Sequence, residues 1–258
     1  MKKKLSLVLA TLMLLGLLAG CGGQPAASGD KDTVVVYIGD IFNSMTPYMT
    51  TANSDQAVFD QVYETLTVTK DDGTVAPCLA KSWKMSDDCL EYTFQLEEGV
   101  KFHNGEVMTA DDVVYSFEQY LANPAKNNFV SMIDKVEMVD ANTVKVTLNK
   151  ITPLFLVYIN ELPILNKKFV EEHNGNISDV ACGTGPYKLT SIDLATSAML
   201  ERNDDYRLAP AAIEKVELRY VGDRSTASVQ LETGDLDIMS IDPSQLVSFE
   251  NNDKFTVE

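Results

Sequence analysis

The sequence is poor in positive charge and in the residues from which metal and catalytic centres are built. It has 21 lysines and arginines against 38 aspartates and glutamates, a formal charge of −17, and only two histidines. Nucleic-acid phosphates bind clustered cations, and no basic block occurs beyond the first four residues, which argues against a nucleic-acid partner. Neither a CxxC pair nor a Gly-x-Ser-x-Gly motif occurs. We therefore expect no metal, no cofactor and no catalytic residue.

The amino-terminal apolar run is too short to span a membrane. Lys2, Lys3 and Lys4 precede a mainly apolar stretch over residues 5–18. At about 1.5 Å per residue this stretch reaches roughly 21 Å as a helix, less than the roughly 30 Å of bilayer hydrocarbon. Positive residues followed by a short apolar run are typical of a secretory signal peptide, which we predict over residues 1–20.

The apolar run ends in Leu18-Ala19-Gly20-Cys21, which resembles the lipobox of bacterial lipoproteins. The resemblance implies that Cys21 carries a lipid, becomes the new amino terminus and anchors an extracytoplasmic protein to the bacterial cell membrane. Residues 22–32 are small and polar and cannot bury enough surface to fold. We predict the lipidated Cys21 and a flexible tether over residues 21–32, with folded structure beginning near residue 33.

Three further cysteines, Cys78, Cys89 and Cys182, leave at least one thiol unpaired in an oxidising compartment. Their spacing matches no zinc or redox motif. We interpret them as buried apolar thiols.

Hydrophobic periodicity in the first half predicts both strands and helices. A β-branched run indicates a strand at residues 34–38, and strict alternation indicates a half-buried strand at 90–96. Ser54 is expected to cap a helix that contains Val58 and Val62. Thr109 and Asp112 resemble a capping box, followed by a helix with Val113, Phe117 and Leu121 on its buried face that ends before Pro124.

The second half reads as alternating strands and one helix. Strands are predicted at residues 187–192, 197–202 and 216–220, then a helix over 224–233 that ends at Gly234, then a strand at 236–238. Strand, helix and strand in this order are typical of an α/β domain. Residues 63–180 are mostly predicted strands and turns.

His103, Glu106, Asp111 and Asp112 are the strongest local concentration of ionisable side chains around a histidine. A metal site needs three or four convergent ligands, and no nucleophile or oxyanion donor lies nearby in the sequence. Asn104 and Gly105 form a hairpin-turn dipeptide, and the acids precede a predicted helix. We interpret this group as turn and capping residues.

Several blocks, in a fixed order along the chain, together carry a family resemblance. These blocks are 62–66 (VYETL), 72–83 (DGTVAPCLAKSW), 86–96 (SDDCLEYTFQL), 99–105 (GVKFHNG), 109–117 (TADDVVYSF), 183–187 (GTGPY), 201–206 (ERNDDY) and 234–238 (GDLDI). They resemble the family 5 extracellular solute-binding proteins, the peptide, dipeptide and nickel-type receptors of ABC importers. Cys89 is a departure, because it stands where the family usually has glycine.

The resemblance implies an α/β fold of the periplasmic-binding-protein type II kind. Its first lobe is expected over residues 33–62 and 181–258 and is incomplete, and a β-rich subdomain is expected over 63–180. Family members are typically about twice as long, so the second lobe is expected to be absent from this chain.

The implied function is that of a lipid-anchored receptor that captures peptides or similar small solutes between two lobes and delivers them to an ABC permease and ATPase. Thr50, Thr51, Ala52 and Asn53 match positions that approach the ligand in relatives, although a solvated loop that caps the next helix would have the same sequence. The alternative function is an exported carboxylate-dependent hydrolase, which needs two carboxylates in a cleft, one with a raised pKa.

Overall fold

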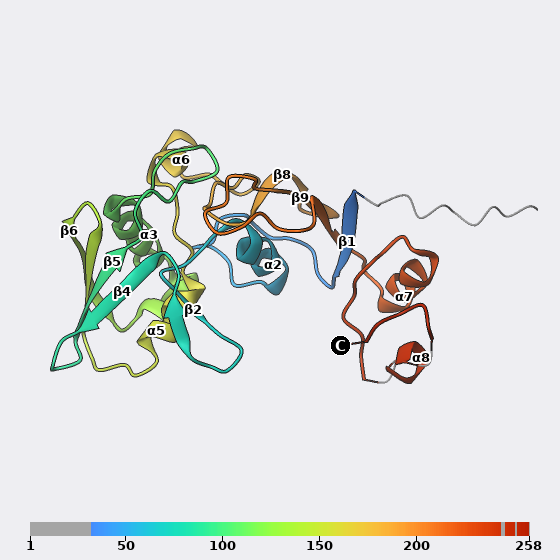
Figure 1. Ribbon diagram of the computed structural model, residues 1–258, viewed down its shortest axis with the longest axis horizontal. Coiled ribbons are helices and arrows are strands. Elements are labelled where there is room, and N and C mark those ends of the chain that lie inside the picture. Colours follow the sequence, from blue (N-terminus) through green and yellow to red (C-terminus); the bar gives the residue numbers. More distant parts are fainter. Residues whose placement is uncertain (1–31, 244–245, 251, 258) are drawn as a thin grey trace, which may run out of the picture. The chain divides into compact units, whose positions relative to one another are not determined.

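The computed structural model describes residues 32–243, 246–250 and 252–257 (Figure 1). The predicted signal peptide, the predicted lipidation of Cys21 and the tether up to Lys31 lie outside the described residues. Within the described ranges the fold is mixed α/β, and no helix there is long and apolar enough to cross a bilayer.

The first sheet brings together strands that are far apart in the sequence. It consists of β1 (Thr33–Ile38), β8 (Tyr187–Asp193), β9 (Ser197–Arg202) and β10 (Lys215–Tyr220), in the order β1-β10-β9-β8. β1 is parallel to β10, whereas β10, β9 and β8 pair antiparallel. Figure 1 shows the blue β1 strand beside the orange strands of the second half of the chain. The four strands predicted here are confirmed.

The strand predicted at residues 236–238 is not formed as a continuous ladder. Ile238 makes a single parallel bridge to Val36, and its carbonyl accepts the Tyr37 N–H at 2.8 Å. The Val35 N–H donates instead to the Asp237 carboxylate, at 2.8 Å. A side chain therefore takes a hydrogen bond that a backbone carbonyl would take in a regular strand.

The second sheet is wholly antiparallel. Its strands are β4 (Ala80–Met85), β5 (Glu91–Leu96), β6 (Ile133–Asp140) and β7 (Thr143–Leu148), in the order β4-β5-β7-β6, and β2 (Thr67–Thr69) and β3 (Val75–Pro77) form a separate pair. β5 alternates buried and half-buried residues, as its sequence predicts.

Helix α3 (Ala110–Ala122) packs against β6 and β7 and begins as predicted. The Asp112 carboxylate accepts the Thr109 N–H at 2.9 Å and the Thr109 hydroxyl at 3.1 Å. Leu121, predicted on the buried face, is 39% exposed, and Tyr120 is buried in its place. At 3.6 residues per turn, position 120 continues the row of Val113 and Phe117 into the second sheet.

The remaining helices are short apart from two of ten residues. α7 (Arg224–Thr233) confirms the predicted helix: the Asp223 carboxylate accepts the Thr226 N–H at 2.8 Å, and Gly234 ends it with φ of 82°. The others are α2 (Asn53–Val62), η1 (Pro124–Lys126), α4 (Asn127–Val130), α5 (Phe155–Tyr158), η2 (Ile159–Glu161), α6 (Lys167–Glu172) and α8 (Leu246–Glu250).

The predicted cap of α2 is wrong. Ala52 occupies the N-cap position, and the Ser54 hydroxyl lies inside the helix and donates to the Ile41 carbonyl at 2.7 Å. The tertiary contact with Ile41 takes the hydroxyl that a local cap would use.

One large apolar core extends through both sheets, and a smaller one lies between β1 and α7. The smaller core contains Val35, Tyr37, Val221, Ala227 and Leu236. The large core contains the fully buried rings of Phe59, Phe94, Phe117, Tyr120 and Phe155. The predicted division into a lobe (33–62 and 181–258) and a subdomain (63–180) stays a prediction.

The segment Gly183-Thr-Gly-Pro-Tyr187 crosses the end of α2 in close contact. The Gly185 N–H donates to the Val62 carbonyl at 2.9 Å, and a Cβ on Gly183 would lie 1.9 Å from that oxygen. Only glycine fits at such an approach, and the next element is the strand β8 rather than a helix. These glycines therefore allow two backbone segments to cross in close contact.

Candidate functional site

The carboxyl ends of three parallel segments lie at one edge of the first sheet. β1 and β10 are parallel, and Val36 and Ile238 form a parallel bridge on the other side of β1. The Val221 N–H donates to the Ile38 carbonyl at 3.4 Å, where β1 and β10 end. In open α/β sheets, ligands bind outside the carboxyl ends of the strands. This edge, with the loops that leave it, is the candidate ligand site.

The loop over residues 39–52 leaves β1 at this edge and is held in place by backbone hydrogen bonds. The Phe42 N–H donates to Leu194 and the Met45 N–H donates to Ser178, both at 2.9 Å. Phe42, Met45 and Tyr48 are buried in the large core. The sequence of this loop, with its Gly, Asn, Ser, Pro and Thr residues, predicts irregular structure, and the structure shows an irregular loop with fixed contacts.

The four predicted ligand contacts lie together where this loop enters α2, but their side chains differ in availability. The Thr50 hydroxyl is buried, donates to the Asp55 carboxylate at 2.7 Å and accepts the Ala52 N–H at 3.1 Å. Ala52 is half-buried, whereas Thr51 and Asn53 are exposed. Thr51 and Asn53 thus offer polar side chains to solvent, and Thr50 already donates its proton inside the protein.

Asp55 holds the loop to the helix. Its carboxylate is fully buried and accepts the Asn43 N–H at 2.7 Å as well as the Thr50 hydroxyl. A buried carboxylate needs such partners because desolvation of its charge is costly. Sequence analysis missed Asp55, although an acid in the first turn of a predicted helix was a signal for it.

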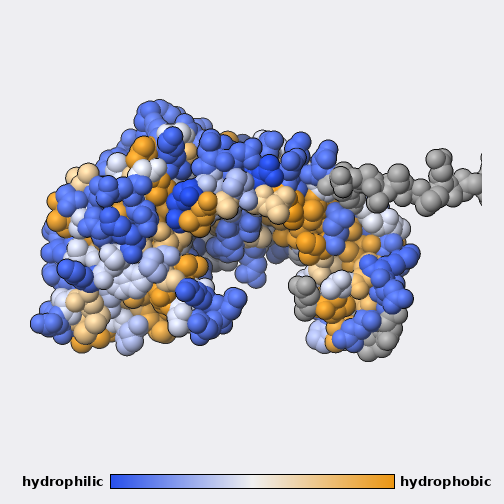
Figure 2. Space-filling model, in the orientation of Figure 1, coloured by the Kyte–Doolittle hydropathy of each residue, from blue (hydrophilic) through white to orange (hydrophobic). Residues whose placement is uncertain are grey.

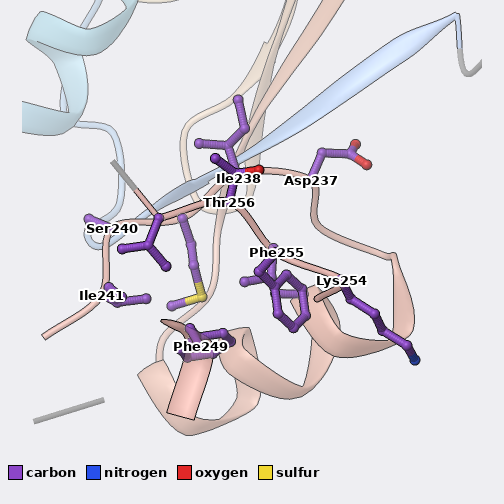
Figure 3. A pocket seen from close by; sticks show the side chains of 11 residues that line it. Asp237, Ile238, Ser240, Ile241, Phe249, Lys254, Phe255 and Thr256 are labelled. Atoms are coloured by element: carbon purple, nitrogen blue, oxygen red, sulfur yellow. The ribbon is translucent and has the colours of Figure 1, made fainter. Parts of the chain in front are cut away.

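A second part of the candidate site is a cavity of about 680 Å³ that no sequence pattern indicated (Figure 3). Its lining combines polar and apolar groups, and the rings of Phe249 and Phe255 meet edge to face at 5.2 Å. Figure 3 shows the Asp237 carboxylate and the Lys254 amine pointing away from these rings. In Figure 2, apolar surface gathers beside α7 and α8. The lining residues are Leu231, Asp237, Ile238, Met239, Ser240, Ile241, Phe249, Lys254, Phe255, Thr256 and Val257.

Arg224 fastens the segment after α7 to this edge. Its guanidinium lies 5.9 Å from the centre of the Tyr37 ring. Its Nη1 donates to the Ser240 carbonyl at 3.1 Å and lies 3.2 Å from the Asp242 carboxylate. The first turn of α7 and residues 240–242 are therefore joined beside β1, an arrangement between distant residues that periodicity alone does not predict.

The acids around His103 have separate structural partners. Asp112 caps α3, Asp111 pairs with the Lys167 amine at 2.8 Å, and Glu106 accepts from the Asn166 amide at 3.0 Å. His103 Nε2 lies 3.0 Å from the Gly185 carbonyl. These contacts agree with the interpretation of the group as turn and capping residues.

The electrostatics of the described carboxyl groups do not favour acid catalysis. Where their pKa is shifted it is lowered, by hydrogen bonds that stabilise the charged form: at Asp72, Asp88, Glu106, Glu137 and Asp223. A general acid of the glycosidase kind needs the opposite shift. Among the described residues, no three His, Cys, Asp or Glu side chains are grouped so that they could hold a metal ion.

A mixed α/β fold with a candidate site at the carboxyl edge of its first sheet places the protein among the type II periplasmic binding proteins. Over residues 74–258 the chain matches "Bacterial extracellular solute-binding proteins, family 5 Middle". The chain belongs to this family of solute-binding proteins.

Relatives and solved structures agree with this assignment. The chain is 30% identical over 247 residues to the probable D,D-dipeptide-binding periplasmic protein DdpA of Escherichia coli (strain K12), covering 90% of this chain and 48% of that protein. NikZ from Campylobacter jejuni, in complex with Ni(L-His), superposes with a TM-score of 0.78 at 30% identity. The match covers 86% of this chain and 46% of the NikZ chain.

A third comparison is DppA from Helicobacter pylori in complex with the peptide STSA. Its TM-score is 0.77 at 27% identity, over 86% of this chain and 49% of that one. The chain thus spans about half the length of the relatives that it matches.

Proposed function

We propose that the protein is the extracytoplasmic solute receptor of an ABC importer, which captures peptides or similar small solutes and delivers them to a permease and ATPase. The observation that carries the proposal is the family match over residues 74–258. The names of the relatives support it, since they are binding proteins for a D,D-dipeptide, for glutathione, for nickel and for heme. We further propose that Cys21 carries the lipid that anchors the receptor to the membrane.

The proposed capture mechanism is closure of two lobes around the ligand. The ligand favours the closed state because it then contacts both lobes. In this proposal residues 33–62 and 181–258 belong to one lobe and 63–180 to its subdomain. The wall of the binding site is the carboxyl edge of the first sheet, where the loop over 39–52 is held by Asp55 and the large core.

We propose Thr50, Thr51, Ala52 and Asn53 as the ligand-contacting segment. The exposed side chains of Thr51 and Asn53 would contact the ligand directly, while Thr50 holds the segment through its hydrogen bond to Asp55. Hydroxyl and backbone groups of this kind bind an extended peptide without selecting its side chains. A peptide or a compact polar solute therefore fits this segment best.

The alternative, an exported carboxylate-dependent hydrolase, has less support. It requires a carboxyl group with a raised pKa beside a second carboxylate in a cleft. The shifted carboxyl groups of the described residues have lowered pKa values. The family consists of binding proteins, and we propose no catalytic residue for this chain.

A thermal-shift screen tests the proposed function. The full-length protein, with both lobes, is expressed from Gly22 onward, so that no lipid is attached, and is screened against a dipeptide and tripeptide library, glutathione, Ni(L-His) and heme. A ligand that binds the folded protein at 100 times its Kd stabilises it by about 2.7 kcal/mol, which raises the Tm by several degrees. Calorimetry then measures the Kd of each solute that raises the Tm.

The contact segment is tested with the solute so identified. Thr51→Trp should weaken its binding at least tenfold, because the indole fills space next to the ligand. Thr74→Trp, at an exposed threonine before β3, is the matched control and should leave the Kd unchanged. Equal affinity of both variants would overturn the assignment of the segment, and hydrolysis of a peptide by the purified protein would favour the alternative.

A further inference from the structure

Glu64 lies where the chain passes from α2 of the first half of the fold to the second sheet. It follows the last residue of α2 by two positions and precedes β2. Its side chain is 7% exposed. A carboxylate at this depth needs charged or hydrogen-bonding partners, because water no longer solvates it.

Three side chains from two distant segments supply those partners. Arg207 binds the carboxylate with two bonds, from Nη2 to Oε1 at 2.7 Å and from Nε to Oε2 at 3.3 Å. The Tyr206 hydroxyl donates to Oε1 at 3.0 Å, and the Cys78 thiol lies 3.6 Å from the same oxygen. Paired Arg and carboxylate groups of this bidentate kind fix orientation as well as distance.

This ion pair differs from the surface pairs of the protein. The Glu64 and Arg207 side chains are 7% and 21% exposed, whereas those of the surface pair Glu98 and Lys81 are 68% and 39% exposed. Screening by water makes an exposed pair weak, and burial makes the loss of one partner costly. The Glu64 pair is therefore the one whose removal should be felt beyond its own side chains.

The partners belong to different parts of the fold. Tyr206 and Arg207 follow β9 of the first sheet, while Cys78 precedes β4 of the second sheet. The chain returns from the second sheet to the first through residues 181–187, and this return crossing lies at the same place. The Asn203 side-chain amide donates to the Gly185 carbonyl at 3.1 Å, and the Asn203 backbone N–H donates to the Pro186 carbonyl at 2.8 Å. Both chain crossings between the sheets are thus held by residues 203–207.

We propose that Glu64, Arg207 and Tyr206 form a latch that locks the two chain crossings, residues 62–66 and 181–187, and closes off the Cys78 thiol. While the latch is closed, the two sheets move together as one body. Any bending of the protein must then take place outside these crossings. The inference concerns the internal mechanics of the chain and does not depend on the proposed function.

Cys78 is a built-in reporter of the latch. Burial and the Glu64 charge raise its thiol pKa to about 11, so at neutral pH the thiol is protonated and reacts slowly with alkylating reagents. Loss of the Glu64 charge alone would lower that pKa and speed alkylation. For this reason alkylation is read together with amide hydrogen exchange, which reports opening of the backbone directly.

The test compares Glu64→Gln with the matched control Glu98→Gln, which removes the exposed pair with Lys81, in protein expressed from Gly22 onward. Peptide-resolved mass spectrometry measures alkylation of Cys78 and amide exchange along the chain. In Glu64→Gln we expect at least tenfold faster alkylation and at least tenfold faster exchange in residues 62–66 and 181–187. Exchange in β5 and β7 should stay within twofold, as should every rate in Glu98→Gln.

Three outcomes would overturn the latch. One is unchanged exchange in both crossings, even if alkylation is faster. Another is equal acceleration over the whole chain, which would show general loss of stability. If Glu64→Gln does not fold, two other variants replace it. They are Arg207→Lys, which keeps the charge but not the bidentate contact, and Tyr206→Phe. The third outcome is that both of these variants fold and their crossings exchange amide hydrogens at the same rate as in the unmodified protein.

Discussion

The neutral form of His103 uses both of its ring nitrogens at the return crossing. A carbonyl oxygen only accepts, so Nε2, 3.0 Å from the Gly185 carbonyl, carries the proton, and Nδ1 accepts the Gly183 N–H at 3.4 Å. Burial of the ring lowers its pKa from 6.5 to about 4. A proton added to Nδ1 would point at the Gly183 N–H, which is itself a donor. Charging His103 therefore breaks a contact between the sheets.

Protonation of His103 should therefore make the protein less stable as the pH falls. The unfolded chain binds this proton below pH 6.5 and the folded chain only near pH 4, so stability is complete above 6.5 and is lost between 6.5 and 4. Urea unfolding at pH 7 and pH 4.5 should show that His103→Gln loses about 2 to 3 kcal/mol less than the unmodified protein over this range. His173→Gln, which removes the other imidazole, is the control. Equal losses for all three proteins would refute the assignment.

Cys89 holds a backbone conformation that suits glycine. Its φ of 58° lies in the left-handed region, where a Cβ costs about 1–2 kcal/mol, and its N–H donates to the Ser86 carbonyl at 2.9 Å in the turn before β5. The thiol makes one weak contact, 3.9 Å from the Asp87 carbonyl. Cys89, like Cys78, is half-buried, and only Cys182 of the three described thiols is buried as expected.

Cys89→Gly should raise the free energy of unfolding by about 0.5–1 kcal/mol, because relief of the left-handed strain exceeds the added freedom of the unfolded chain. Cys89→Ala keeps the Cβ and should not stabilise the protein. Urea titration of both variants measures the difference. A glycine variant no more stable than the alanine variant would show that the turn is not strained.

At the scale of elements, the start of α3 connects helix and sheet to the loop before α6. Besides capping the helix through Thr109, the Asp112 carboxylate accepts the Lys167 N–H at 3.0 Å. Asp111, one residue earlier in the same turn, is exposed and bonds only the Lys167 amine in the described contacts, at 2.8 Å. Neighbouring acids of one helix turn thus have different roles.

Asp112→Ala should lower the free energy of unfolding by about 2 kcal/mol, since it removes a cap and leaves the Lys167 N–H without its acceptor. Asp111→Ala removes an exposed pair and should cost about 0.5 kcal/mol or less. Chemical denaturation of the two variants gives the comparison. Equal costs would mean that charge at the helix start, and not the cap geometry, provides the stabilisation.

At the scale of the whole molecule, we expect attachment of the protein to the membrane to depend on one side chain, that of Cys21 at the end of the apolar run. Cys21→Ala should move the protein from the membrane fraction to the soluble or medium fraction of the native bacterium, because the proposed lipid then has no attachment point. Fractionation and labelled palmitate measure the effect. Membrane-bound, labelled Cys21→Ala protein would contradict the proposed anchor.

Local patterns in the sequence determined most of the elements and the family. Alternation over residues 90–96 predicts β5, Gly234 predicts the end of α7, and Thr109 with Asp112 predicts the start of α3. Such signals succeed because they depend on neighbours within a few residues. The blocks from residue 62 to 238 predicted family 5, which the match over 74–258 confirms.

Only the tertiary structure decided how distant residues use their polar groups. Thr50 bonds Asp55, Ser54 bonds Ile41 instead of capping α2, and the Asp237 side chain replaces a strand bond to Val35. The pairing of β1 with β10 and of Glu64 with Arg207 joins residues that are far apart in the sequence. No local periodicity encodes these choices, because each is set by which surfaces the packed core brings together.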